Sequence, residues 1–287
     1  MSNVSWWRTN FTNGEAQQIS EAMANEHISQ GVLTEQFERR LAEELNVPYV
    51  VVTTSGSIGL LMAMMAIGIQ PGDEIIVPNR TWIATAHSPM ILGAKVVLVD
   101  VLPNIPVMDV AQVRKKITPR TKAIIPVHLN GRSVEMGELD VIAKEYGLSI
   151  VEDACQALFS KNSNGFLGTQ SDIGCFSLGV SKLISTGQGG VIVTRNENTY
   201  EKLKLIRNHG TTTNIDPIYS LLGCNFKFTD LLASIGMVQL AQAKRRINHV
   251  NQIYAKYSNI IEGLPFVNII PVDTSNGEIP LYIEVLC

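Results

Sequence analysis

Residues 151–194 read VEDACQALFSKNSNGFLGTQSDIGCFSLGVSKLISTGQGGVIVT, and this stretch decides the fold that we expect. It begins where one short apolar run, residues 148–151, ends and it closes with another, residues 191–194, and runs of this kind predict strands. Asp153 follows the first run, and Lys182 lies in the loop that precedes the last one. The glycines of residues 187–190 predict a tight backbone path from this loop into the next strand. The stretch therefore places a carboxylate and an amine near the ends of predicted strands.

Outside this stretch, short β-branched runs alternate with longer helical patterns. Nearly continuous apolar runs separated by helices are typical of a largely parallel sheet that is covered on both faces. We therefore predict an α/β fold with a mainly parallel central sheet. The predicted strands are Tyr49–Thr53, Glu74–Val77, Lys95–Asp100, Ala123–Val127, Ser149–Glu152, Gly174–Ser177 and Val191–Thr194, and the predicted helices between them are Ser57–Ile67, Thr85–Leu92, Val110–Ile117 and Met136–Tyr146.

The pattern changes after Thr194, where two helical segments and two strand-like runs follow. The last run has no apparent partner strand, which indicates a domain that is cut short. We predict a large domain over residues 1–240 and the start of a small, incomplete C-terminal α/β domain over residues 241–287. The segments are the helices Thr199–Arg207 and Thr229–Glu262 and the strand-like residues 267–270 and 281–286.

Composition gives no reason to expect nucleic acid as a partner. The chain has 287 residues, 45% of them hydrophobic, so it can bury a large core. Its formal charge of -3 gives no electrostatic reason to expect a polyanion. The most basic run, KRRINH at residues 244–249, is predicted to be a solvated helix face.

The cellular location is predicted from what the sequence lacks. The four cysteines show neither CxxC nor metal-ligand spacing and fit a reducing compartment. No apolar run of a secretory signal accompanies Trp6, Trp7 and Arg8. The most apolar stretch, Gly59–Ile69, is shorter than the roughly 20 residues that a membrane span needs. We therefore predict a soluble cytoplasmic protein with no metal site and no membrane partner.

The sequence TTSGSIGL, residues 53–60, follows a predicted strand and opens a predicted helix. Backbone N–H groups at a helix N-terminus attract phosphate, so the groups around Gly56 and Ser57 form a candidate phosphate cradle. Gly56 allows close backbone approach, and Ser57 adds a hydroxyl donor. A serine here is also a common helix N-cap that needs no ligand, and both interpretations stay open.

Three further residues lie just past strand ends. Trp82, in PNRTWIATA, is placed to stack on a planar heterocycle, with a position in the core as the alternative. A carboxylate at Asp153 would keep a pyridine nitrogen protonated, so that the ring accepts the electrons of a carbanion. A helix cap is the alternative for Asp153. Gln156 is placed to share a face with Asp153 and donate to a phenolic oxygen.

Lys182 is the residue that these groups would serve. A lysine nucleophile, an acidic residue at a strand end and a phosphate cradle are the set that pyridoxal 5'-phosphate (PLP) chemistry requires. Most lysines on a protein surface are only solvated, which is the alternative here.

Six segments resemble, in order and spacing, the DegT/DnrJ/EryC1/StrS family of PLP-dependent nucleotide-sugar aminotransferases. Together they cover most of the chain. The resemblance implies the fold of the PLP-dependent transferases related to aspartate aminotransferase, fold type I. The segments are TSGSIGL (54–60), GIQPGDEIIVPNRTWIATA (68–86), ITPRTKAIIPVHLNG (117–131), IVEDACQA (150–157), DIGCFSLGVSKLISTGQGG (172–190) and CNFKFTDLLASIGMVQL (224–240).

The resemblance implies a role for each candidate residue. Lys182 matches the catalytic lysine that forms a covalent aldimine with PLP. Asp153 matches the partner of the pyridine nitrogen, Gln156 the neighbour of the O3' oxygen, and Trp82 the aromatic that stacks on the ring.

The resemblance also implies how the phosphate is held. Gly56, Ser57 and Ser177 match its binding groups. Asn225 resembles an asparagine that reaches the phosphate from the partner subunit, so that the active site is shared in a homodimer. A turn residue in a loop is the alternative for Asn225.

The activity implied is transfer of an amino group, expected to come from glutamate, to a keto sugar carried on a nucleoside diphosphate. Surface polysaccharide, such as the O antigen of lipopolysaccharide, or amino-sugar biosynthesis is the expected setting. Related sugar dehydratases carry histidine in place of the lysine, so Lys182 favours amino transfer. Leu183 and Gln188 replace an asparagine and a glutamate that are usual in the family, and neither change removes a group that the chemistry demands.

Two other functions are weighed against this one. Family members generally continue beyond the point where this sequence stops, so a PLP-binding but catalytically silent regulator or assembly protein is the alternative. A nicotinamide dehydrogenase would also fit an α/β pattern, but the sequence lacks GxGxxG after the first predicted strand.

Overall fold

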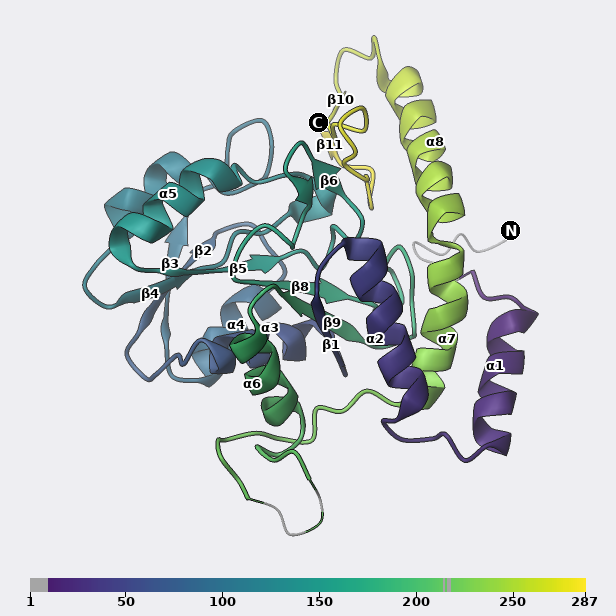
Figure 1. Cartoon of the computed structure of the whole chain (residues 1–287). Coiled ribbons are helices and arrows are strands. Elements are labelled where there is room, and N and C mark those ends of the chain that lie inside the picture. Colours follow the sequence, from purple (N-terminus) through teal and green to yellow (C-terminus); the bar gives the residue numbers. More distant parts are fainter. Residues whose placement is uncertain (1–9, 214, 216–217) are drawn as a thin grey trace.

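The computed structural model describes residues 10–213, 215 and 218–287, so Trp6, Trp7 and Arg8 lie outside the described residues. The main strands are β1 (Tyr49–Thr53), β2 (Glu74–Pro78), β3 (Lys95–Val99), β4 (Thr121–Ile124), β5 (Ser149–Asp153), β8 (Ile173–Ser177) and β9 (Gly190–Thr194). They form one sheet in the order β1-β9-β8-β5-β4-β2-β3 (Figure 1). Neighbours are parallel from β8 to β3, whereas β9 is antiparallel to both β1 and β8. The prediction of an α/β fold with a mainly parallel sheet is confirmed.

Side chains of the strands alternate between the two faces of the sheet. On β1, Val50 and Val52 pack in a core with α2 (Val32–Leu45), whereas Val51 packs in a core with α3 (Gly56–Ala66). Successive residues of a strand point to opposite faces, so a strand that is covered on both sides is apolar at each position. This is why the strand runs of the sequence are nearly continuous in apolar residues.

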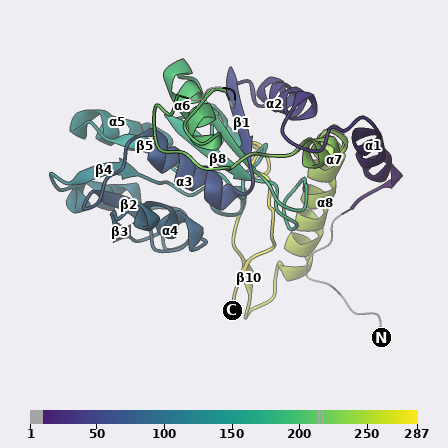
Figure 2. The same cartoon turned by 90° about the horizontal axis from the view of Figure 1, so that it is seen from below.

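The helices cover both faces. With α3, the helices α4 (Ala84–Ile91) and α6 (Glu197–Arg207) pack on one face of the sheet. The opposite face packs against α2 and α5 (Met136–Tyr146). Figure 2 shows α1 (Asn13–Ala24), α7 (Asp230–Ala241) and α8 (Ala243–Ile261) gathered with α2 at the β1 end of the sheet.

The elements at the two ends of the chain differ from the predictions. The predicted helix Thr229–Glu262 is two helices, α7 and α8, which meet at Gln242. The helices α1 and α2 were not predicted, although Thr12 and Glu15 form a capping box at the start of α1. Residues 110–117 were predicted as a helix and form the 3-10 helix Val110–Lys116.

Two small two-stranded antiparallel sheets complete the fold. The strands β6 (Lys161–Asn162) and β7 (Gly165–Phe166) pair with each other, as do β10 (Asn268–Ile269) and β11 (Val285–Leu286). Figure 1 shows the C-terminal segment in yellow, between α8 and the β6 hairpin. The division into domains at residue 240 stays a prediction. In the part of the chain that the structure describes, none of the helices combines the length and the apolar character of a membrane span.

A buried ion pair ties α2 and α6 to β1. Arg207 of α6 donates to Glu38 Oε1 at 2.5 Å and to the carbonyl of Val52 at 3.0 Å. The same carboxylate oxygen accepts the Val52 N–H at 2.8 Å. The side chains of Arg207 and Glu38 are only 6% and 11% exposed. The pair is therefore hydrogen-bonded and buried, so that neither charge reaches water freely.

Replacing Glu38 by Ala should leave the Arg207 guanidinium buried without its counter-charge. We expect the free energy of unfolding to fall by about 3–5 kcal/mol, measured by urea denaturation. The matched control is Glu43→Ala, which removes an exposed carboxylate of the same helix paired with Arg40 at 3.3 Å. This control should change stability by less than about 1 kcal/mol. Equal losses in the two variants would contradict the role assigned to the buried pair.

Candidate active site

The carboxylate of Glu152, at the end of β5, is buried on one face of the sheet. It has no exposed surface and accepts hydrogen bonds from the Gly168 N–H at 2.7 Å and the Gln170 N–H at 2.8 Å. The Ser171 hydroxyl donates to it at 2.8 Å. A buried carboxylate that is satisfied by this many donors is held in one orientation, which fixes the end of β5.

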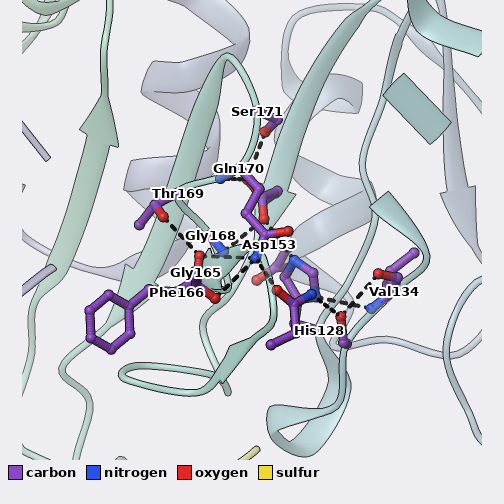
Figure 3. A network of polar contacts seen from close by, with 12 residues as sticks. His128, Val134, Asp153, Gly165, Phe166, Gly168, Thr169, Gln170 and Ser171 are labelled. Carbon is purple, nitrogen blue, oxygen red and sulfur yellow. Dashed lines mark hydrogen bonds and ion pairs between the residues drawn. The ribbon is translucent and has the colours of Figure 1, made fainter. Parts of the chain in front are cut away.

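His128 completes this network (Figure 3). The Val134 N–H donates to Nδ1 at 3.3 Å, so Nδ1 is the acceptor and Nε2 carries the hydrogen that points at Glu152, 2.9 Å away. Both side chains are fully buried. His128 is therefore a structural histidine, and it is oriented away from the face on which Asp153 lies.

Asp153 points to the opposite face of the sheet, the face that packs against α3. Its carboxylate accepts the Thr85 hydroxyl at 2.6 Å and the Cys155 N–H at 3.1 Å. Residues 154–160 form turns, so the carboxylate does not act as the cap of a following helix. The Asp153 side chain instead contributes to the wall of a cavity.

This cavity has a volume of about 490 Å³ and lies at the carboxyl ends of β5 and β8, beside the N-terminus of α3. Small-molecule sites in proteins are typically of roughly 300–1,000 Å³, so the volume suits a cofactor with part of a substrate. The structure brings seven of the eight predicted site residues together in its lining. These are Gly56, Ser57, Trp82, Asp153, Gln156, Ser177 and Lys182.

The first turn of α3 forms one end of the cavity. Ser55 is the N-cap, and its hydroxyl accepts the Ile58 N–H at 3.2 Å. Ser55 therefore supplies the cap, whereas Ser57 is the second residue of the helix and lines the cavity. A Cβ atom on Gly56 would lie 2.8 Å from Cys155 Sγ and 3.0 Å from Ser177 Cβ. Only glycine allows the helix start to approach β8 this closely.

This end of the cavity suits an anion. The positive end of the α3 dipole and the hydroxyl groups of Ser57 and Ser177 come together there. A helix N-terminus stabilises a negative charge by about 0.3–1 kcal/mol, and hydroxyl donors add to this. The donor set therefore fits a phosphate group such as that of PLP.

Trp82 and Gln156 form another part of the wall. The Trp82 side chain is 71% exposed, so it is not a core residue, and it lies in the loop between β2 and α4. The Asn130 N–H donates to Gln156 Oε1 at 2.9 Å. This bond assigns the orientation of the Gln156 amide, whose Nε2 donors stay available to an acceptor in the cavity.

Lys182 lies in the loop between β8 and β9 and is half-buried in the cavity wall. The backbone N–H of Lys182 donates to the Gly179 carbonyl at 3.0 Å, and this bond closes a tight turn. The loop then returns to the sheet at Gly190, where a Cβ atom would lie 2.2 Å from the Ser55 carbonyl oxygen. This contact is the physical reason for glycine at position 190, because the loop and the start of α3 touch there through their backbones.

Asn225 is the one predicted residue that the structure leaves apart from the others. It is exposed, it is paired with Asn208 in an isolated β-bridge, and its Oδ1 accepts the Lys227 N–H at 3.4 Å. Asn225 is not among the described residues that line the cavity of this chain. Within a single chain it is a loop residue, and its predicted role in a partner subunit stays a prediction.

Several residues of the site were not predicted, among them Thr85, Ser181 and Tyr282. Thr85, which holds the Asp153 carboxylate, lies within PNRTWIATA, and its place at the start of a helix after β2 was the available signal. Ser181 precedes the lysine and lines the cavity. Tyr282 lines it from the C-terminal segment, and no local pattern of the sequence indicates that this segment returns to the sheet.

A match to the DegT/DnrJ/EryC1/StrS aminotransferase family extends over residues 10–286. The chain belongs to this family. The resemblance seen in the sequence is thereby confirmed, and with it the prediction of a PLP-dependent aminotransferase. Among curated proteins, the chain is 32% identical over 265 residues to a GDP-perosamine synthase of Escherichia coli O157:H7, covering 92% of this chain and 73% of that protein.

Two further comparisons show which proteins this chain is similar to. A GDP-perosamine synthase of Caulobacter vibrioides is 35% identical over 81% of this chain, which spans 63% of that protein's length. The solved structure of a GDP-4-keto-6-deoxymannose-3-dehydratase with a trapped PLP-glutamate geminal diamine is similar with a TM-score of 0.88 and 26% identity. The match covers 98% of this chain and 78% of the dehydratase chain. The predicted fold class, a PLP-dependent transferase, is confirmed by this likeness.

We predict that the Cys155 thiol in the cavity wall is unreactive toward alkylating reagents. Burial raises the pKa of Cys155 well above its ordinary value, and the nearby Asp153 carboxylate raises it further. At about pH 8 the thiol should therefore stay protonated, and the thiolate is the reactive form. We expect iodoacetamide to alkylate the exposed Cys224 and to spare Cys155, as measured by peptide mass spectrometry. Equal labelling of the two in the folded protein would contradict this environment.

Proposed function

We propose that this chain transfers an amino group from an amino acid, glutamate in the first instance, to a keto sugar linked to a nucleoside diphosphate. PLP, held by a covalent bond to Lys182, would supply the electron sink for this reaction. The observation that carries the proposal is that Lys182, Asp153 and the anion-binding end of α3 share one cavity. The family and its nucleotide-sugar relatives support the same reaction class.

The residues of the cavity have distinct tasks in this proposal. The carboxylate of Asp153, held by Thr85, would face the pyridine nitrogen and keep its proton in place. The free Nε2 donors of Gln156 would stabilise the phenolic oxygen, and the indole of Trp82 would lie over the ring. Ser57, Ser177 and the Gly56 backbone would bind the phosphate.

The amine of Lys182 has a second task once the amino donor has displaced it. As a free amine in a half-buried wall, it would take a proton from the substrate carbon and return it to the cofactor side, acting as base and then as acid. A histidine at this position could not form the covalent bond, so a lysine favours amino transfer over dehydration. The setting that we propose is cytoplasmic amino-sugar or surface-polysaccharide biosynthesis.

A Lys182→Ala variant tests this proposal. With PLP and glutamate, the wild-type protein should change its visible spectrum as the cofactor takes up the amino group, and a keto-sugar nucleotide should reverse the change. In Lys182→Ala the rate should fall at least about a thousandfold, because both the covalent bond and the acid–base group are lost. The control, Lys144→Ala, removes an exposed lysine on α5 and should keep the wild-type rate. Undiminished amino transfer in Lys182→Ala would refute the assignment.

We also propose that the protein is a homodimer in which Asn225 of each chain completes the phosphate site of the other. The exposure of Asn225 supports an intermolecular role, as do exposed apolar side chains in the loop that precedes it. These side chains are Ile215, Ile218, Tyr219 and Leu222, at 66–86% exposure.

Mixing two inactive variants tests the shared site. Lys182→Ala and Asn225→Ala should each lose activity, but a hybrid dimer has one site with both native residues. After unfolding and refolding an equal mixture, we expect roughly a quarter of wild-type activity, since half of the dimers are hybrids with one intact site each. If Asn225 acts within its own chain, the mixture should show no activity beyond the sum of the separate variants.

A further inference from the structure

The C-terminal segment is attached to the cavity wall by Asn130. The Nδ2 of this side chain donates to the Tyr282 carbonyl at 2.6 Å, and its Oδ1 accepts the Tyr282 N–H at 2.5 Å. One amide therefore satisfies both backbone groups of Tyr282. The backbone N–H of Asn130 donates to Gln156, so the same residue links Tyr282 to a side chain proposed to contact the cofactor.

The two residues that follow Asn130 hold the rest of the segment. Gly131 has φ +81°, and a Cβ atom on it would lie 2.0 Å from the Ile279 carbonyl oxygen, so only glycine fits. Arg132 is 1% exposed and donates to the Pro271 carbonyl at 2.8 Å and to the Glu284 carboxylate. The docking of the segment is thus built into three consecutive residues, and Tyr282 is held at a defined place.

The Tyr282 side chain reaches into the cavity next to Lys182. Its hydroxyl donates to Ser181 Oγ at 3.1 Å, and Ser181 precedes the lysine in the chain. The groups that suit a phosphate, Ser57 and Ser177, come instead from α3 and β8. Tyr282 therefore belongs to a part of the wall that the proposed cofactor contacts do not use.

The chemistry of this part of the wall suits a sugar. A phenol and an alcohol are uncharged groups that both donate and accept hydrogen bonds, as sugar hydroxyls do, and an aromatic ring packs on the apolar face of a sugar ring. A carboxylate ligand would instead need a cationic side chain that is free to pair with it. The two guanidinium groups of this region, Arg80 and Arg132, are both paired with Glu284.

We propose that Tyr282 is a substrate-positioning residue that binds the keto sugar, its hydroxyl exchanging the bond with Ser181 for one with a sugar oxygen. This inference rests on the proposed function. It predicts that the second half-reaction, with the sugar, depends on the Tyr282 hydroxyl, and that the first half-reaction, with glutamate, does not.

The test compares the two half-reactions in Tyr282→Phe. Single-turnover absorbance measures the reaction of glutamate with the PLP form of the protein. It then measures the reaction of the aminated form with GDP- and UDP-linked 3-keto and 4-keto hexoses. For the sugar that the wild-type protein uses best, we expect the half-saturating concentration to rise about tenfold, which corresponds to one lost hydrogen bond. The glutamate half-reaction should stay within about twofold of wild type.

Tyr254→Phe is the matched control. The Tyr254 hydroxyl accepts the Val272 N–H at 2.9 Å, so it holds the same segment from α8, outside the described lining of the cavity. This variant should keep wild-type values in both half-reactions. If it raises the half-saturating concentration of the sugar as much as Tyr282→Phe does, the effect comes from loosening the segment, and the inference is overturned.

The remaining outcomes separate this inference from the proposed function. Should Tyr282→Phe match the wild-type protein with the sugar, or lose both half-reactions equally, Tyr282 is not the sugar-positioning residue. Should the wild-type protein react with glutamate but with none of the keto sugars, the proposed sugar substrate is wrong, and the inference falls with it.

Discussion

The opposite orientation of two adjacent carboxylates at the end of β5 is the constraint on which the site depends. Glu152 is held on one face of the sheet by His128 and by donors of residues 168–171. Neighbouring residues of a strand point to opposite faces, so Asp153 must then face the cavity. A slip of one residue would exchange the two carboxylates. The price of such a slip is large, because Glu152 would lose its donors and stay buried.

Close contacts at two glycines then bring the other groups to Asp153. Gly56 lets the start of α3 approach Cys155 and Ser177, and Gly190 lets the loop after Lys182 rest on the Ser55 carbonyl. These contacts join elements that follow three different strands, and they leave no room for side chains. The geometry of the anion-binding end and of the lysine is therefore set by rigid backbone. We infer that substitutions at either glycine would disturb cofactor binding through geometry, without removing any reacting group.

The sequence predicted the core of this arrangement because its signals are local. The strand β1 was predicted with its observed bounds, and seven of the predicted site residues line the cavity. The helices α1 and α2 were missed because they precede β1, before the alternation of strands and helices begins. Tyr282 could not be predicted, because its place depends on Asn130, which is 152 residues away in the sequence. Asn225 needs a second chain before its role can be judged.

The most direct measurement of the central claim, that Lys182 is the residue to which PLP is bound, is reduction of the PLP-loaded protein with borohydride, followed by digestion and peptide mass spectrometry. Reduction makes the bond between the cofactor and the lysine amine permanent. The structure predicts one phosphopyridoxyl group per chain, on the peptide that contains Lys182. Labelling at another lysine, or scattered labelling of several exposed lysines with Lys182 unmodified, would contradict the claim.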